Sequence, residues 1–110
     1  MCLYWHRLVQ RKYRTLEKTI MKYRHLGNSG LEVSVIGLGT NNFGGRMEFK
    51  EAREVIFAAL DEGINLIDTA DIYSHGNSEE IIGRSLVDRR DEALIATKFG
   101  MVWEEGPHGK

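Results

Sequence analysis

Residues 64–73 combine a predicted strand with reactive side chains, in the sequence Ile64-Asn65-Leu66-Ile67-Asp68-Thr69-Ala70-Asp71-Ile72-Tyr73. The apolar run at residues 64–67 ends in the carboxylate of Asp68, and the phenol of Tyr73 follows five positions later. A short apolar run of this kind is typical of a parallel strand that is buried on both faces. Residues that follow such a strand lie at its carboxyl end, where α/β proteins bind their ligands.

Two further apolar runs flank this strand at equal distances. Residues 35–38 precede it and residues 93–96 follow it, so that Ile36 and Asn65 are 29 positions apart and Asn65 and Leu94 are again 29 apart. Each interval contains one helical pattern of apolar residues. The spacing therefore predicts parallel strands that alternate with helices.

The helices are predicted from apolar spacing and from signals at their ends. The first spans residues 49–62 and stops at Gly63, and the second starts at Asn77 or Ser78. Glu79 and Glu80 then fall in the first turn of the second helix, where carboxylates complement the helix dipole. One face of the first helix carries six apolar residues: Phe49, Ala52, Val55, Ile56, Ala59 and Leu60.

The resulting fold class is α/β. Residues 22–25 and 31–34 flank the turn signal Gly27-Asn28-Ser29-Gly30, which predicts a hairpin before the first parallel strand. A (β/α)8 barrel of about 250 residues has a repeating unit of about 31 residues, and the observed period fits it. A doubly wound sheet has a similar period. Periodicity alone therefore leaves both architectures open.

Composition limits the classes of protein to consider. The 110 residues amount to one domain or less. No stretch approaches the ~18 consecutive apolar residues that indicate a membrane span. The single cysteine, Cys2, cannot form an internal disulfide, so we expect a reducing, cytoplasmic setting.

Charge divides the chain into a basic N-terminal extension, residues 1–20, and a body, residues 21–110. The extension has a net charge of +4 and the body a net charge of −5. An acidic body argues against binding to a nucleic-acid backbone. The extension has basic and apolar stripes at helical spacing, which a membrane surface or a targeting system can read. An extension without a fixed role is the simpler interpretation, and we expect it to be dispensable for the fold.

Polar residues follow each of the three predicted strands. Thr40, Asn41 and Asn42 come after the first, Asp68 and Tyr73 after the second, and Lys98 after the third. Asp68, Tyr73 and Lys98 suit carbonyl reduction, because the carbonyl oxygen gains negative charge and needs a proton donor.

In this interpretation Tyr73 is the acid. A free phenol has a pKa of about 10, which a neighbouring ammonium such as Lys98 lowers. Asp68 would keep that ammonium charged. The spacing is also compatible with a purely structural set, in which Asp68 caps a loop, Tyr73 packs and Lys98 is solvated.

Several motifs together resemble the aldo/keto reductases. Asp68-Thr69-Ala70-Asp71-Ile72-Tyr73 matches that family's Asp-Thr-Ala-x-x-Tyr motif, and Thr97-Lys98 after an apolar strand matches its catalytic lysine. The hairpin and first strand are similar as well, in Tyr23-Arg24-His25-Leu26-Gly27 and Gly37-Leu38-Gly39-Thr40. Ser29-Gly30-Leu31, Phe43-Gly44-Gly45 and Gly63-Ile64-Asn65 look most like the branch with potassium-channel β subunits and related bacterial and plant reductases. The resemblance covers about residues 21–101.

The resemblance implies a (β/α)8 barrel whose N-terminal part, the hairpin and about three βα units, occupies residues 21–110. It implies hydride transfer from NADPH to an aldehyde or ketone, a small-molecule carbonyl substrate. The implied catalytic residues are Asp68, Tyr73 and Lys98 together with a histidine. The residues that it places near the nicotinamide half of NADP(H) are Thr40, Asn41, Arg46 and Asp68.

Two features depart from the family pattern. Asn41 and Asn42 stand where this branch often has a tryptophan. The family's histidine lies about one βα unit beyond the lysine, whereas His108 lies ten residues beyond Lys98 in a Gly106-Pro107-His108-Gly109 loop and does not match it. We therefore expect a fragment of the family's barrel that has no reductase activity alone.

The same residues suggest three other interpretations. A Rossmann domain would use Gly37-x-Gly39-x-x-Asn42, but its third glycine is missing and the following helix starts too late. A metal site built from Asp68, Asp71, His75 and His108 has no known ligand spacing, so no metal is expected. A non-catalytic interaction subunit, like the channel β subunits, stays open as the alternative function.

Overall fold

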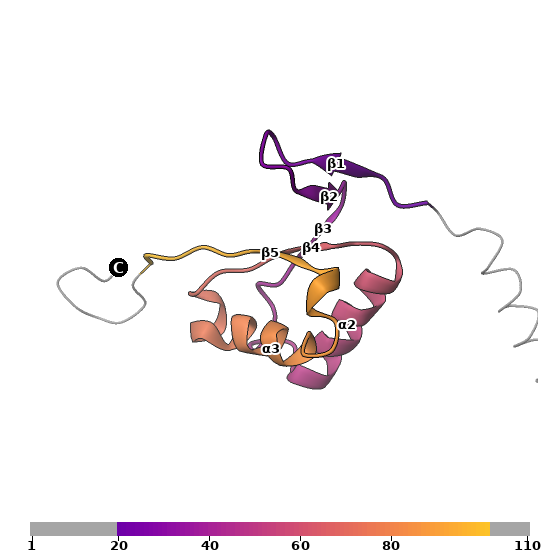
Figure 1. Cartoon of the computed structure of the whole chain (residues 1–110). Coiled ribbons are helices and arrows are strands. Elements are labelled where there is room, and N and C mark those ends of the chain that lie inside the picture. The colour runs from indigo at the N-terminus through magenta and orange to yellow at the C-terminus, as the bar shows by residue number, and fades with distance from the viewer. Residues whose placement is uncertain (1–19, 102–110) are drawn as a thin grey trace, which may run out of the picture.

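The computed structural model describes residues 20–101, and Figure 1 shows their arrangement. Predictions for residues 1–19 of the basic extension and for His108 fall outside this range. None of the described helices is long and apolar enough to cross a membrane. The elements in chain order are β1 (Tyr23–His25), β2 (Glu32–Ser34), β3 (Gly37–Gly39), α2 (Phe49–Asp61), β4 (Leu66–Asp68), the 3-10 turn η1 (Tyr73–Gly76), α3 (Asn77–Ser85), the 3-10 turn η2 (Arg90–Glu92) and β5 (Leu94–Ala96).

Three parallel strands form the central sheet in the order β3-β4-β5. The last residues of the strands are in register, because Gly39 pairs with Asp68 and Asp68 pairs with Ala96. All three strands therefore end at the same edge of the sheet. One helix lies between each pair of neighbouring strands, as the spacing of the apolar runs predicts.

The hairpin β1-β2 is antiparallel, with Arg24 opposite Val33, which confirms the hairpin prediction. Tyr23 fastens it to the body, because the phenol donates a hydrogen bond of 2.7 Å to the carbonyl oxygen of Gly63. Asn65 adds a second link, since its side-chain amide contacts the backbone of both Ser34 and Glu32. The hairpin is thus tied to the amino ends of the sheet strands.

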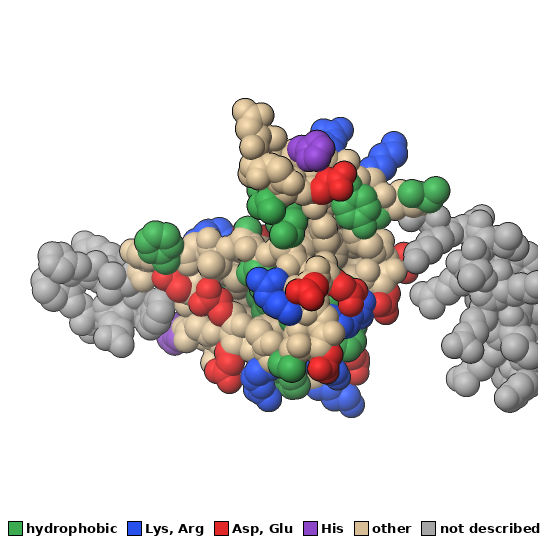
Figure 2. All heavy atoms as spheres, viewed as in Figure 1, with side chains coloured by type: hydrophobic (Ala, Val, Ile, Leu, Met, Phe, Trp, Pro, Cys, Tyr) green, Lys and Arg blue, Asp and Glu red, His purple; other side chains and the backbone are tan. Residues whose placement is uncertain are grey.

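Helices α2 and α3 lie together on one side of the sheet (Figure 1). Ile67 in the central strand is fully buried beneath them. The core also contains Phe43, Ala52, Ile56, Leu60, Ile81, Ile82, Leu86 and Ala93. On the outer surface of this helical layer, acidic and basic side chains are mixed (Figure 2), as expected for a solvated face.

Helix α2 begins at Phe49, where the sequence predicts, and ends at Asp61, one residue before the predicted end. The backbone N–H of Glu48 donates to the side chain of Glu51, which satisfies one donor at the helix start. Gly63 follows the last turn with φ of +87°, a conformation that glycine adopts without a steric penalty. Helix α3 begins at Asn77, one of the two predicted positions.

Two details of the strand prediction are wrong. Val35 and Ile36 are not strand residues, and they are 48% and 55% exposed. They form the bend between the hairpin and β3, where the N–H of Val35 donates to Lys22. The described strands are also not buried on both faces, because α2 and α3 cover only one face of the sheet and Leu38, Leu94 and Ile95 stay partly exposed.

Candidate active site

The carboxyl edge of the sheet carries the candidate site. Asp68 is the last residue of β4, and Lys98 lies two residues after the end of β5. Because Asp68 is in register with Ala96, the two side chains start from neighbouring points on the same edge. The sequence prediction that separate strands bring these groups together is therefore confirmed for this pair.

Lys98 is held by three oxygen atoms. Its Nζ donates to Asp68 Oδ1 at 2.9 Å, to Asp68 Oδ2 at 3.0 Å and to the backbone carbonyl oxygen of Thr69 at 2.7 Å. The side chains of Lys98 and Asp68 are 50% and 48% exposed, so the pair is open to solvent on one side. An ammonium with all three donors engaged has one well-defined position.

The pKa of Lys98 is raised above its ordinary value. The hydrogen bond to Asp68 is the largest cause, and the negative charge of Asp68 together with the nearby Tyr73 adds to it, while partial desolvation acts in the opposite direction. Lys98 is therefore a cation throughout the neutral pH range.

Tyr73 opens η1 and lies against this cation. The Lys98 Nζ is 5.2 Å from the centroid of the Tyr73 ring, a distance at which a cation and an aromatic ring attract each other. The amino-acid trio Asp68, Tyr73 and Lys98 is thus assembled at one edge.

The backbone directly after Tyr73 is strained. Ser74 and His75 have φ of 50° and 55°, and Gly76 follows with φ of 88°. Non-glycine residues in the left-handed region cost about 1–3 kcal/mol each and are concentrated at functional sites. The sequence shows no signal for this strain beyond Gly76.

The predicted cofactor-binding residues occupy different environments. Thr40 is 1% exposed, and its hydroxyl donates a hydrogen bond of 2.9 Å to the carbonyl oxygen of Asp68. The Thr40 side chain therefore bonds to the protein itself. Asn41 and Arg46 are exposed in the turn that follows β3, where the N–H of Arg46 donates to the carbonyl oxygen of Asn42. The side chains of Asn41 and Arg46 form no hydrogen bond or ion pair within residues 20–101.

Sequence reasoning missed Asp71 as a contact of the lysine segment. The Asp71 N–H donates to the carbonyl oxygen of Lys98 at 3.0 Å, and Asp71 Oδ2 accepts the N–H of Gly100 at 3.2 Å. Asp71 therefore fixes the backbone on which Lys98 sits. Within the described part of the chain, no group of three His, Cys, Asp or Glu residues could hold a metal ion.

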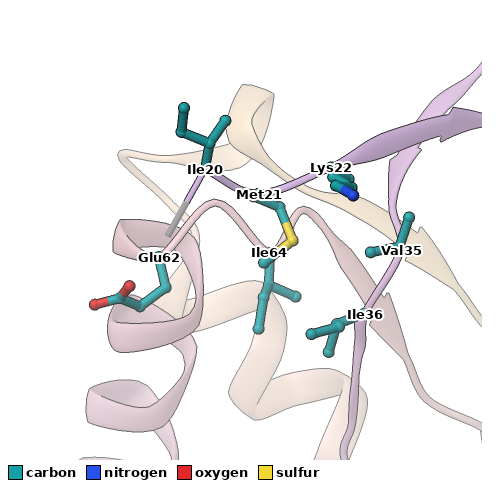
Figure 3. Close-up of a pocket in the computed structure, with 7 residues that line it drawn as sticks. All are labelled: Ile20, Met21, Lys22, Val35, Ile36, Glu62 and Ile64. Carbon is teal, nitrogen blue, oxygen red and sulfur yellow. The ribbon is translucent and has the colours of Figure 1, made fainter. Parts of the chain in front are cut away.

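A pocket of about 400 Å³ lies at the opposite end of the sheet. Figure 3 shows apolar side chains around it, together with Lys22 and Glu62, and they come from the chain before β1 and from the residues before β3 and β4. The lining residues are Ile20, Met21, Lys22, Val35, Ile36, Glu62 and Ile64. Because it faces the amino ends of the strands, this pocket is separate from the Asp68–Lys98 edge.

Comparison with known proteins decides the family. Residues 35–110 match the model of the aldo/keto reductase family. The chain belongs to the aldo/keto reductase family. This confirms the resemblance seen in the motifs around Asp68, Tyr73 and Lys98, and it makes the chain part of an oxidoreductase enzyme family.

The similar curated proteins include both a reductase and a channel subunit. The aldo-keto reductase YhdN of Bacillus subtilis is 44% identical over 90 residues, which are 76% of this chain and 27% of the relative. A probable voltage-gated potassium channel subunit beta of Oryza sativa is 38% identical over 95 residues, 82% of this chain and 28% of the relative. The chain thus spans little more than a quarter of these proteins.

Solved structures agree on the fold. The holo form of the aldo-keto reductase AKR11C1 from Bacillus halodurans aligns with a TM-score of 0.70 at 40% identity, covering 81% of this chain and 29% of that one. Such neighbours are (β/α)8 barrels, so the predicted α/β barrel class is confirmed. The described residues form the hairpin and three parallel strands of that architecture, without a closed barrel.

Proposed function

We propose that the protein to which these residues belong reduces aldehydes or ketones to alcohols with NADPH. The observation that carries the proposal is the contact of Lys98 Nζ with both Asp68 carboxylate oxygens. The same nitrogen lies 5.2 Å from the centroid of the Tyr73 ring. A carboxylate, an ammonium and a phenol in this arrangement can deliver a proton to a carbonyl oxygen.

The reaction adds a hydride to the carbonyl carbon and a proton to the carbonyl oxygen. A bound dihydronicotinamide supplies the hydride. Tyr73 donates its phenolic proton to the oxygen, and the charge that stays on the Tyr73 oxygen is stabilised by the Lys98 ammonium. Asp68 keeps Lys98 charged and in place during this step. Solvent then returns a proton to Tyr73 through the exposed side of the site.

The donor groups near the site fit the nicotinamide half of NADP(H). Its carboxamide needs hydrogen-bond partners, and the pyrophosphate that joins it to the adenosine half is an anion. Asn41 offers an exposed amide, and Arg46 offers an exposed guanidinium without an intramolecular partner in the described range. We assign Asn41, Arg46 and Asp68 to this half of the cofactor. Thr40 would act indirectly, by holding the backbone of Asp68.

The alternative of a non-catalytic interaction subunit has weaker support. The identity to the rice channel subunit, 38%, does not exceed the 44% identity to the reductase YhdN. A protein that served only as a binding partner would also have no need for a triply hydrogen-bonded lysine at the sheet edge. The comparison therefore does not favour the alternative.

The test is carbonyl-dependent oxidation of NADPH by a chimera in which residues 20–101 replace the corresponding segment of YhdN. Saturable turnover with an aldehyde panel is expected, and NADPH binding is followed in parallel by fluorescence. A chimera that folds and binds NADPH but reduces no carbonyl would refute the proposal. Capture of a channel protein by such an inactive chimera would then favour the interaction subunit.

A further inference from the structure

Each of the three sheet strands is followed immediately by a threonine. Thr40 follows β3, Thr69 follows β4 and Thr97 follows β5. All three threonine side chains are hydrogen-bonded to the first turn of helix α3. Thr40 and Thr69 contact Ser78, and Thr97 contacts Glu79. One helical turn is therefore linked to the ends of all three strands.

Ser78 is at the centre of this arrangement. It is fully buried, and its Oγ lies 2.9 Å from Thr40 Oγ1, 3.1 Å from the Thr40 carbonyl oxygen and 3.0 Å from Thr69 Oγ1. A hydroxyl with partners on two different strand ends fixes the distance between them. Burial makes these bonds strong, because no water can replace a lost partner.

Counting protons gives the direction of the chain of hydroxyls. The single hydroxyl proton of Thr40 goes to the carbonyl oxygen of Asp68 at 2.9 Å, so Ser78 donates its proton to Thr40, where Oγ1 and the carbonyl oxygen share it. Ser78 has then used its only proton, and Thr69 must donate to Ser78. The chain runs from Thr69 through Ser78 and Thr40 to the backbone of Asp68.

Both partners of the catalytic ion pair are next to this network. Asp68 receives the Thr40 hydroxyl and the Thr40 N–H on its carbonyl oxygen. Lys98 directly follows Thr97, whose hydroxyl donates a hydrogen bond of 2.6 Å to Glu79 Oε1. The first turn of α3 is thus connected to the backbone on each side of the Lys98–Asp68 contact.

We propose that Ser78 is a positioning residue for the ion pair. Its buried hydroxyl sets the place of Asp68 relative to Lys98, and Glu79 fixes the Lys98 side of the contact through Thr97. The inference rests on the proposed function, because the pair must be held accurately only if it serves catalysis. The test measures the ion pair itself and does not depend on turnover. The positioning role of Ser78 and the proposed reductase function can therefore fail independently.

The experiment compares the wild-type 110-residue chain with Ser78→Ala and Ser85→Ala. Ser85 is a matched control, because it is a buried serine of the same helix whose hydroxyl has no hydrogen-bond partner within the described residues. The measurement is the titration of the Lys98 side chain by NMR. We expect the upward shift of the wild-type Lys98 pKa to be retained in Ser85→Ala and mostly lost in Ser78→Ala.

Amide hydrogen exchange separates positioning from general loss of stability. In Ser78→Ala, exchange should accelerate at the Thr40 amide, which is bonded to Asp68, but not at the Ile56 amide inside α2. Should Ser78→Ala lose cooperative unfolding, Ser78→Cys is judged by the same criteria, since a thiol keeps the size but donates weakly. An unchanged Lys98 pKa in the folded variant would overturn the proposal, as would a wild-type Lys98 without a raised pKa.

Discussion

Lys98 Nζ lies within 2.9 and 3.0 Å of the two carboxylate oxygens of Asp68, although 30 positions separate the two residues in the sequence. The contact follows from the strand register, which aligns Asp68 with Ala96. Two residues that are one βα unit apart in the sequence thus form a direct ion pair, because their parallel strands are neighbours in the sheet. The proposed chemistry of the site depends on this relationship.

Asp68→Asn should lower the Lys98 pKa and change how stability depends on pH. The folded-state pKa of Lys98 is raised, so the pair stabilises the fold fully below the ordinary lysine pKa of about 10.4, and the stabilisation is lost as pH rises through the raised value. The wild type should therefore be more stable than the variant at neutral pH, with the difference closing in strong base. Urea unfolding across this range measures it.

Asp61→Asn is the control for that experiment. Asp61 pairs with Arg89 at 3.0 Å, and arginine does not titrate below pH values of about 12. Any difference between wild type and Asp61→Asn should therefore persist where the Asp68→Asn difference closes. A constant difference for Asp68→Asn over the whole range would show that Lys98 is not the group that titrates.

Ile67→Ala should destabilise the fold strongly. Ile67 is fully buried in the central strand beneath both helices, and removing a buried isoleucine side chain costs about 2–5 kcal/mol. Val87→Ala, at a side chain that is 75% exposed, should change the free energy of unfolding by no more than about 0.5 kcal/mol. Equal effects in denaturant titrations would mean that the sheet does not pack on α2 and α3 as described.

Gly44→Ala should cost more than Gly30→Ala. The two glycines have φ of +76° and +77°, so the backbone penalty, about 1–2 kcal/mol, is the same. A Cβ on Gly44 would lie 2.5 Å from Asn77 Cβ, whereas a Cβ on Gly30 meets nothing within 4 Å. Overpacking adds about 1–3 kcal/mol at Gly44 only.

The difference between the two unfolding free energies isolates this close approach. Asn77 starts α3, immediately after the strained turn that follows Tyr73. A clash there should also displace Tyr73. Identical losses for Gly44→Ala and Gly30→Ala would contradict the contact between the loop after β3 and the start of α3.

The order of elements was predictable because it depends on local signals. Gly63 stops α2 through its positive φ, and the apolar runs form β4 and β5 because each packs against the helices. Val35 and Ile36 differ from the prediction, because their apolar side chains indicate a strand whereas they lie in the bend before β3. Their backbone is instead directed by contacts with Lys22 and Ser34, which are tertiary and not visible in an apolar pattern.

The meeting of Asp68, Tyr73 and Lys98 at one sheet edge was predictable, whereas the residues that hold this edge in place were not. Asp68 and Lys98 stand out because they are charged residues at the carboxyl ends of apolar strands, where α/β proteins bind their ligands. Ser78 and the Asp71 contact with Lys98 have no such signal, because a serine near a helix start and an aspartate in a loop have common structural roles. Thr40 was predicted beside the cofactor, and its burial reveals a contact with the Asp68 backbone that the sequence could not show.

The most direct test of the account is the rate of carbonyl-dependent NADPH oxidation by the YhdN chimera with Tyr73→Phe. Phenylalanine keeps the ring beside Lys98 and removes the proton donor. Tyr23→Phe is the matched control, because it removes a phenol whose one hydrogen bond within residues 20–101 is to Gly63, at the other end of the sheet. The account predicts that Tyr73→Phe abolishes turnover while NADPH binding and the Tyr23→Phe rate are preserved. A Tyr73→Phe variant that turns over at the rate of the unmodified chimera would contradict it.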